Sequence, residues 1–238
     1  MKSLLLSIIL CLGSLGTALS QSRWMVGASA GVGFSKTPGS DTLANQFSTR
    51  NRLGGYGNLQ LSYDLNRATS LLFGIGYLNA GYKINNDTMA FNTSINNGMN
   101  YFTGRLGMAL RQQFGKSNYI SEKFGFSFNY ELGNSTLDTF NNQDAGTRFR
   151  IIQEQQRVWN ALGFVGVAFG GNTEGGNRYE FHLTYYQPLN TTHGLRVQHS
   201  EFFSGEFPLT FKGGNLQIGI NYYFNFGNFQ KTEEYFYD

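Results

Sequence analysis

The last regular segment of the chain, Leu216 to Phe226, alternates apolar and polar residues. Even-numbered positions hold Leu, Ile, Tyr or Phe, and the positions between them hold mainly Asn, Gln or Gly. A period of two places successive side chains on opposite faces of a strand. The segment therefore predicts a β-strand with one apolar and one polar face, which by itself also suits a half-buried strand of a soluble sandwich.

Similar alternation recurs along the chain before this segment. No helical period separates the segments, so the pattern predicts an all-β meander. One segment, Trp159 to Phe169, is apolar on both faces apart from its glycines, and its orientation stays open. The other predicted strands are Trp24–Phe34, Leu53–Leu65, Leu71–Tyr77, Phe102–Arg111, Lys123–Leu132 and Tyr179–Tyr186.

The connections between these strands alternate strictly in length. Short connections lie at Asn66-Arg67, Gly115–Ser121 and Gly170–Asn177, and long polar ones at Lys36–Arg52, Lys83–Gly98, Asn134–Arg157 and Asn190–Gly214. An even number of strands, with short turns at one end and long loops at the other, is typical of a bacterial outer-membrane barrel. A soluble sandwich has no reason to segregate loop length. We therefore expect an all-β, transmembrane, antiparallel up-and-down β-barrel of about eight strands, whose closure removes exposed strand edges.

The N-terminus has the features of a secretory signal. Met1 to Ser20 contains Lys2, a short apolar run and small residues before Gln21. We expect a signal peptide over residues 1–20, the barrel over residues 21–226, and a periplasmic tail over residues 227–238. The one cysteine, Cys11, lies in the signal, so the exported chain would contain no disulfide.

Composition supports a sheet that meets lipid. Charged residues make up 14% of the chain and aromatic residues 16%, whereas soluble domains contain roughly 25% charged residues. Few charges and many aromatics fit strands that expose every second side chain to lipid. The formal net charge of +3 is too small to indicate a nucleic-acid partner.

The final strand also carries a recognisable motif. Gln217, Gly219, Tyr222 and Phe224 match a polar-x-Gly-x-x-hydrophobic-x-aromatic pattern. This pattern resembles the assembly signal that barrel proteins present to the barrel assembly machinery, although such barrels often end at the terminal aromatic. In layout the whole chain is similar to the small OmpA/OmpX-like family of outer-membrane barrels. The resemblance implies the outer membrane of a Gram-negative envelope, with membrane lipid and the assembly machinery as partners.

The lumen is the first candidate functional region, because about eight strands leave an interior just wide enough for side chains. Charges away from water need partners, so the inward polar residues are expected to form a structural network. A narrow porin-like path for ions or small solutes is the alternative. The predicted network comprises Arg105, Arg111, Glu131, Glu180 and His182.

Catalysis is weakly supported. Glu180, His182 and Thr184 share one strand face, but side chains on one strand stand side by side instead of converging on a substrate. The run from His199 to Glu201 alternates faces, and three scattered histidines suggest no metal cluster. We therefore expect no enzyme, cofactor or metal site; a lipid A-modifying enzyme is the weakest alternative.

The long loops are where a partner would bind. The segment from Leu195 to Phe211 keeps strand alternation around a Ser204-Gly205 turn, which predicts a ribbon that protrudes from the membrane. An open edge of such a ribbon can pair with a strand of another protein. We therefore expect a structural or surface-interaction role, with a surface protein or ligand at the loops.

Overall fold

The computed structural model describes residues 24–35, 47–86, 94–133, 149–155, 158–190, 193–199, 206–211 and 214–225. The expected signal peptide, residues 1–20, and the expected tail, residues 227–238, lie outside the described residues. No helix in the described part of the chain is long and apolar enough to cross a bilayer.

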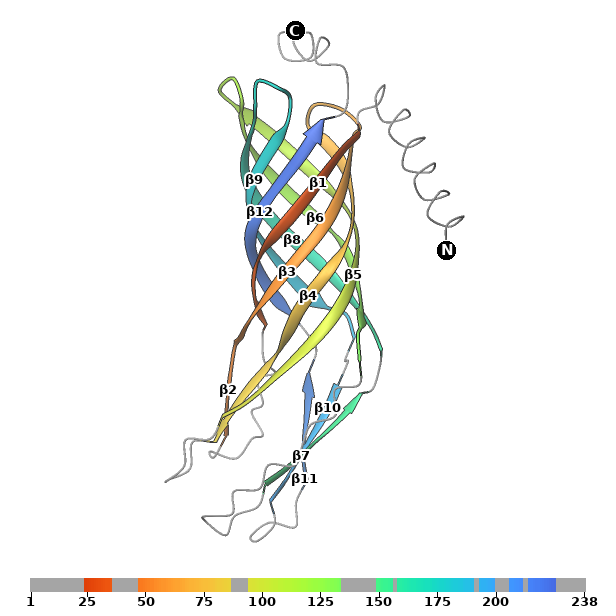
Figure 1. The fold of residues 1–238 in the computed structure, drawn as a ribbon, viewed down its shortest axis with the longest axis vertical. Helices are drawn as coiled ribbons and strands as arrows, with labels where there is room; N and C mark the ends of the chain where they lie inside the picture. The colour runs from red at the N-terminus through yellow and green to blue at the C-terminus, as the bar shows by residue number, and fades with distance from the viewer. Residues whose placement is uncertain are drawn as a thin grey trace, which may run out of the picture.

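Eight antiparallel strands follow one another in sequence order and close into a ring (Figure 1). The last strand pairs with the first, from Met25 opposite Asn225 to Ser35 opposite Asn215. The predicted eight-stranded up-and-down barrel is confirmed. Its strands are β1 (Trp24–Ser35), β3 (Arg52–Asp64), β4 (Thr69–Asn86), β5 (Ser94–Phe114), β6 (Asn118–Glu131), β8 (Trp159–Asn172), β9 (Arg178–Pro188) and β12 (Asn215–Asn225).

The register of the ring sets its width. A path that starts at Met25 and steps from each residue to its partner returns to β1 at Ser35, ten residues further along. With eight strands, this stagger corresponds to a tilt of about 40° and a narrow barrel. The path runs through Ser62, Leu72, Gly107, Gly125, Phe164, Tyr186 and Asn215.

Three tight turns lie at one end of the barrel, here called the turn end (Figure 1, top). The side chain of Asn66 accepts hydrogen bonds from the backbone N–H groups of Ala68 and Thr69, at 2.9 and 2.8 Å. Gly115 and Gly176 have φ angles of 69° and 74°, which favour glycine. These residues allow the chain to reverse its direction within a few positions. The predicted short connections are confirmed.

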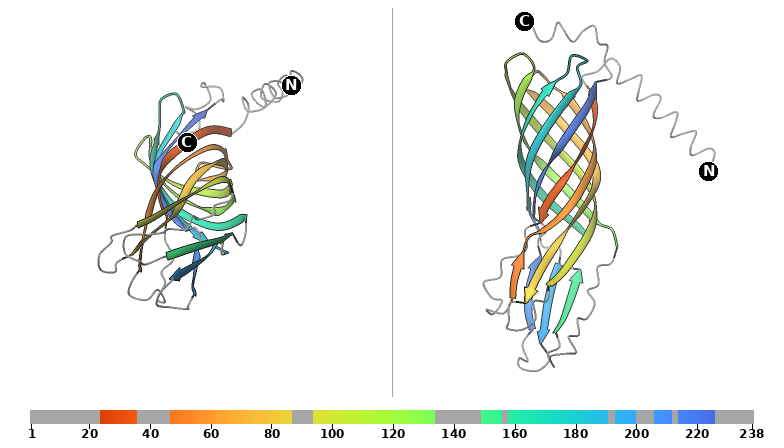
Figure 2. Two further views of the ribbon diagram at one scale, coloured as in Figure 1. Left: turned by 60° about the horizontal axis from the view of Figure 1, so that its bottom comes forward. Right: turned by 60° about the vertical axis from the view of Figure 1, so that its left-hand side comes forward.

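Strands extend past the ring at the opposite end, here called the loop end (Figure 2). Pairing of β3 with β4 stops at Leu78, whereas β4 stays paired with β5 as far as Asn85. The residues of β4 beyond Leu78 add about 25 Å of strand. β2 (Phe47–Arg50) pairs with this extension. Much of the long polar connection predicted over Lys83–Gly98 is therefore paired strand, as far as Asn85 opposite Ser94.

A separate three-stranded antiparallel sheet also lies at the loop end. It contains β7 (Phe149–Gln155), β10 (His193–His199) and β11 (Glu206–Phe211). Leu195 pairs with Leu209, so the antiparallel pairing predicted for this ribbon is confirmed, whereas its predicted Ser204-Gly205 turn lies outside the described residues. β7 was not predicted, because the segment from Asn134 to Arg157 was interpreted as a loop.

The alternation of the sequence matches the two faces of the wall. On each predicted strand, the apolar set is exposed on the outside and the polar set lies inside. β8 resolves the ambiguous case, since Trp159 and Val165 point outward while Leu162 and Phe164 are buried. The lumen is therefore lined partly by apolar side chains, which the sequence pattern did not show.

Candidate functional site

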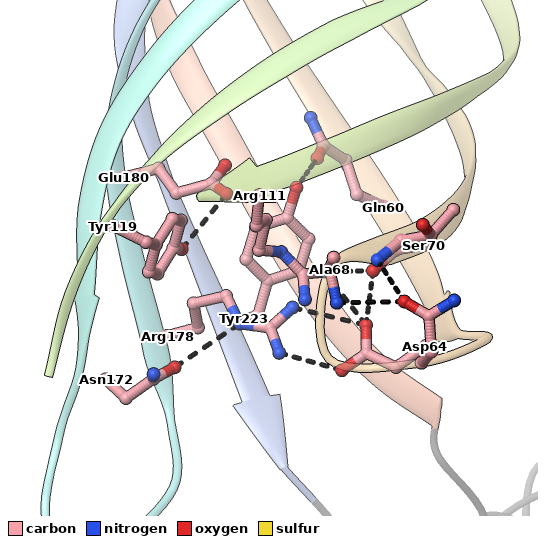
Figure 3. A network of polar contacts seen from close by, with 12 residues as sticks. Gln60, Asp64, Ala68, Ser70, Arg111, Tyr119, Asn172, Arg178, Glu180 and Tyr223 are labelled. Carbon is pink, nitrogen blue, oxygen red and sulfur yellow. Dashed lines mark hydrogen bonds and ion pairs between the residues drawn. The ribbon is translucent and has the colours of Figure 1, made fainter. Parts of the chain in front are cut away.

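A cluster of charges closes the turn end of the lumen (Figure 3). Nη2 of Arg111 and Nη2 of Arg178 each lie 2.8 Å from the carboxylate of Asp64. Ser70 donates a hydrogen bond of 2.5 Å to the same carboxylate. The three charged side chains come from β5, β9 and β3, so the cluster ties distant parts of the ring together. One carboxylate binds two guanidinium groups, so these three side chains together carry a net positive charge.

A second buried cluster surrounds Glu180. Its carboxylate forms an ion pair with Lys123. It also accepts hydrogen bonds from Tyr119, at 3.1 Å, and from Asn221, at 2.8 Å. Glu180 is 3% exposed, so its carboxylate has little access to water. These three donors supply the hydrogen bonds that water would otherwise provide.

Both ring nitrogens of His182, which lies in the middle of the lumen, have hydrogen-bond partners. Nε2 of His182 lies 2.8 Å from the hydroxyl of Tyr56, and Nδ1 lies 3.1 Å from Oγ1 of Thr184. Glu180 binds Lys123, and no hydrogen bond joins it to His182 among the described contacts. The three residues considered for catalysis are therefore not arranged as an acid, base and nucleophile relay.

Arg105 differs from the other lumen cations. Nη2 of Arg105 donates a 2.9 Å hydrogen bond to Gln217. Its guanidinium lies 4.9 Å from the ring centre of Tyr186 and 5.8 Å from that of Tyr56. Neutral groups thus surround this cation, and aromatic faces offset only part of its charge.

The half of the lumen nearer the loop end is more apolar. Leu78, Tyr82, Met99, Tyr101 and Leu162 are each no more than 3% exposed. Tyr82 and Met99 lie on the β4–β5 extension next to this half, and most of the buried charges lie nearer the turn end.

Two pairs of glycines make room for large inward side chains. Gly31 and Gly219 face each other across the seam between β1 and β12. A Cβ atom at Gly219 would lie 2.0 Å from the hydroxyl oxygen of Tyr56. Gly107 and Gly125 likewise pair, and the ring of Phe164 occupies the space beside both. These aromatic side chains pack against bare backbone, which a larger residue would prevent.

The predicted network residues all occupy inward strand positions, but they belong to different clusters. Arg111 joins the Asp64 cluster, Glu180 the Lys123 pair, and Arg105 and His182 the central region. Glu131 is buried near the loop end, at 3% exposure. Arg178, which binds Asp64, was missed because nothing in its sequence context indicates a partner 114 residues away.

The four residues of the assembly motif also divide between the two faces. Gln217 accepts from Arg105 and donates to Asn215 at 2.9 Å, and Gly219 lies beside Tyr56. Tyr222 and Phe224 are exposed on the outside, with ring centres 4.8 Å apart. Among the described residues there is no group of three or more His, Cys, Asp or Glu side chains that would hold a metal ion.

The outer surface carries aromatic residues at two heights. Trp24 and Tyr63 lie near the turn end with ring centres 4.6 Å apart, and Tyr130 and Trp159 lie near the loop end at 4.8 Å. Eleven residues of β6, from Ile120 to Tyr130, span a height of about 25 Å at this tilt, which is the height of a lipid-facing apolar band. Amphipathic rings at the edges of such a band suit the membrane–water interface.

One charge interrupts this apolar surface. In the described part of the closed ring, with β4 taken only as far as Leu78, Glu122 is the sole charged residue at an outward position. It is exposed and lies between Leu110 and Val167 on the neighbouring strands, close to the turn end. A carboxylate near the edge of an apolar band can reach polar headgroups.

A closed ring, an apolar outside with aromatic edges and a polar interior define a membrane-spanning β-barrel. Every strand of the ring pairs with a neighbour on each side, and the outer face has the height and composition that lipid requires.

No protein-family model and no curated protein matches the sequence. Among solved structures, the chain is similar to the outer membrane protein OprG from Pseudomonas aeruginosa, with 9% identity, a TM-score of 0.47, and coverage of 87% of this chain and 99% of that one. It is also similar to the attachment invasion locus protein Ail of Yersinia pestis, with 10% identity, a TM-score of 0.42, and coverage of 86% of this chain and 99% of that one. The outer membrane protein AlkL is similar as well, with 12% identity, a TM-score of 0.41, and coverage of 87% of this chain and 92% of that one. These similarities are low, and the barrel fold rests on the strand pairing of the chain itself.

Proposed function

We propose that the protein is an integral outer-membrane β-barrel with a structural or surface-interaction role at the loop end. The apolar band, the aromatic edges and the antiparallel ring support insertion in that membrane. The N-terminal secretory pattern of residues 1–20 is consistent with export.

The extended strands at the loop end carry the interaction role. The β4–β5 hairpin continues beyond the ring, and the sheet of β7, β10 and β11 lies on the same side of the membrane band. β7 and β11 each pair on one side only within the described residues. Their free backbone groups suit the addition of an extended strand from a surface protein.

The two alternatives have less support. A narrow channel would use the polar turn-end half of the lumen, but Tyr101 and Leu162 are buried in the loop-end half, and Tyr82 and Met99 are buried on the adjoining β4–β5 extension. We propose no catalytic activity, because His182 is buried and both of its ring nitrogens already have partners.

Deletion of Leu195 to Phe211 tests the interaction role, since it removes most of β10 and all of β11 while leaving the ring. We expect the variant to insert normally, migrate faster unheated than boiled on a gel, and lose its surface-binding partners in pull-down and adhesion assays. A variant that folds and keeps every partner and adhesion phenotype would show that the ribbon has no such role. Altered lipid A mass in cells expressing the intact protein would favour the enzyme alternative instead.

A further inference from the structure

A small cavity lies in the middle of the lumen. Its volume is about 40 Å³, which is room for about three water molecules or for one small ion with a water. The cavity lies between the Glu180 cluster and the aromatic groups around Arg105. The residues that line it include Gln60, Arg105, Lys123, His182, Thr184 and Tyr186.

The charges around this cavity are unbalanced. Arg105 and Lys123 line it, and no carboxylate does. Lys123 is neutralised by Glu180, which lies behind it. Arg105 forms no ion pair with any described residue, and its Nε is buried without a hydrogen-bond partner. A largely buried cation without a counter-charge is strongly unfavourable, so something must offset it.

The neutral groups of the wall can also donate hydrogen bonds. Oε1 of Gln60 accepts from Tyr223 at 2.5 Å, which leaves the amide NH₂ group for another acceptor. When Tyr56 donates to Nε2 of His182, the Nδ1–H group donates to Thr184. The proton of the Thr184 hydroxyl is then available for an acceptor in the cavity.

We propose that this cavity binds one small monovalent anion of chloride size, as the counter-ion of Arg105. The guanidinium of Arg105 supplies the charge, and Thr184 and Gln60 supply hydrogen bonds. A cavity of this volume admits a halide ion together with about one water molecule. The inference goes beyond the proposed surface role, because it concerns the closed interior of the barrel.

Crystals of the wild-type protein grown in bromide test the site directly. We expect one anomalous bromine peak in the lumen, in contact with Arg105. Electron density for water alone, with no anomalous peak at the cavity, would overturn the proposal. This experiment needs no variant and therefore does not depend on how a substitution affects folding.

Thermal unfolding in detergent gives a second test. When chloride replaces gluconate at constant ionic strength, the Tm of the wild type should rise by about 3 °C. The rise should level off at high chloride concentration, as expected for a ligand that binds only the folded state. Arg105→Gln should abolish this rise. Arg111→Gln is the matched control, since it removes a lumen cation that does not line the cavity and should keep the rise. A wild type that is insensitive to chloride, or an Arg105→Gln protein that keeps the full rise, would contradict the site.

Discussion

The hydroxyl of Tyr56 lies 2.8 Å from Nε2 of His182, and between their two strands lies the seam that closes the barrel. Tyr56 comes from β3 and His182 from β9, and the strands between them are β1 and β12. The hydroxyl passes over Gly31 and Gly219, which face each other in that seam. One side chain therefore links four strands across the point where the ends of the sheet meet.

Replacing either seam glycine should impair closure. A Cβ atom would lie 2.0 Å from the Tyr56 hydroxyl at Gly219 and 2.6 Å from it at Gly31, and each would also approach a backbone carbonyl of the opposite strand. We expect Gly219→Ala and Gly31→Ala to reduce the folded fraction to a similar extent on refolding into detergent without assembly machinery. Gel mobility of unheated samples measures that fraction.

Gly31 lies outside the assembly motif, which makes this comparison informative. If Gly219→Ala refolds normally in detergent but fails to assemble in cells, the glycine acts through recognition and not through packing. Gly55→Ala is a suitable control, because a Cβ atom there would meet nothing within 4 Å.

Neutralising Asp64 should destabilise the turn end. Asp64→Asn leaves Arg111 and Arg178 without their carboxylate, and breaking a largely buried ion pair typically costs about 3 kcal/mol. Urea unfolding in liposomes measures the change in the free energy of unfolding. Lys116→Gln, in an exposed tight turn, should leave that free energy within experimental error. Equal stability of the two variants would show that the cluster contributes little.

A charge in the middle of the outer band should be poorly tolerated. Phe126 is 55% exposed and lies between Leu106 and Gly163 on the neighbouring strands. Phe126→Arg should lower the free energy of unfolding in a bilayer by about 2–4 kcal/mol, as for a lipid-facing cation near the midplane. Phe126→Leu, which keeps the position apolar, should have a much smaller effect. An arginine variant as stable as the leucine variant would mean that this face is not in lipid.

Removing the outward charge of Glu122 should increase the stability of the barrel in a bilayer. Because Glu122 lies near the edge of the band, Glu122→Leu should raise the free energy of unfolding in liposomes by at most about 1 kcal/mol. A clear loss of stability would instead reveal that the carboxylate binds a cationic partner on the outer surface.

The apolar loop-end half of the lumen should block conduction. Planar bilayers containing the wild type are expected to show no discrete ion steps, because Tyr101 is buried in the narrow ring and Tyr82 is buried on the adjoining β4–β5 extension. The double truncation Tyr82→Ala with Tyr101→Ala should produce small steps, provided that the variant still folds by gel mobility. Wild-type steps that disappear on substitution of Arg105 would support the channel alternative.

The wall of the barrel was predictable because lipid imposes a strict period of two. Phe124, Phe126 and Phe128 face outward as their alternation indicates. β8 was ambiguous for a physical reason, since Leu162 and Phe164 fill the lumen and are as apolar as the lipid face. Apolarity alone does not distinguish a lumen filled with side chains from the bilayer.

The partners within the lumen were not predictable from the sequence. Asp64 and Arg178 meet because of the stagger of the ring, which no local pattern encodes. The sequence also gives little period-two signal in two polar segments, Asn79–Asn86 and Phe149–Gln155. β7 and the far part of the β4–β5 hairpin were therefore interpreted as loops.

The β1–β12 seam also constrains the order of events in folding. Met25 pairs with Asn225, so the contact that completes the ring joins residues 200 positions apart in the chain. A contact of such long sequence separation is slow to form, because the intervening chain must lose much of its freedom first. None of the earlier strands can complete the cylinder before β12 arrives. The unfinished sheet would expose two long edges, so the polypeptide has to be shielded from aggregation until its last strand is available.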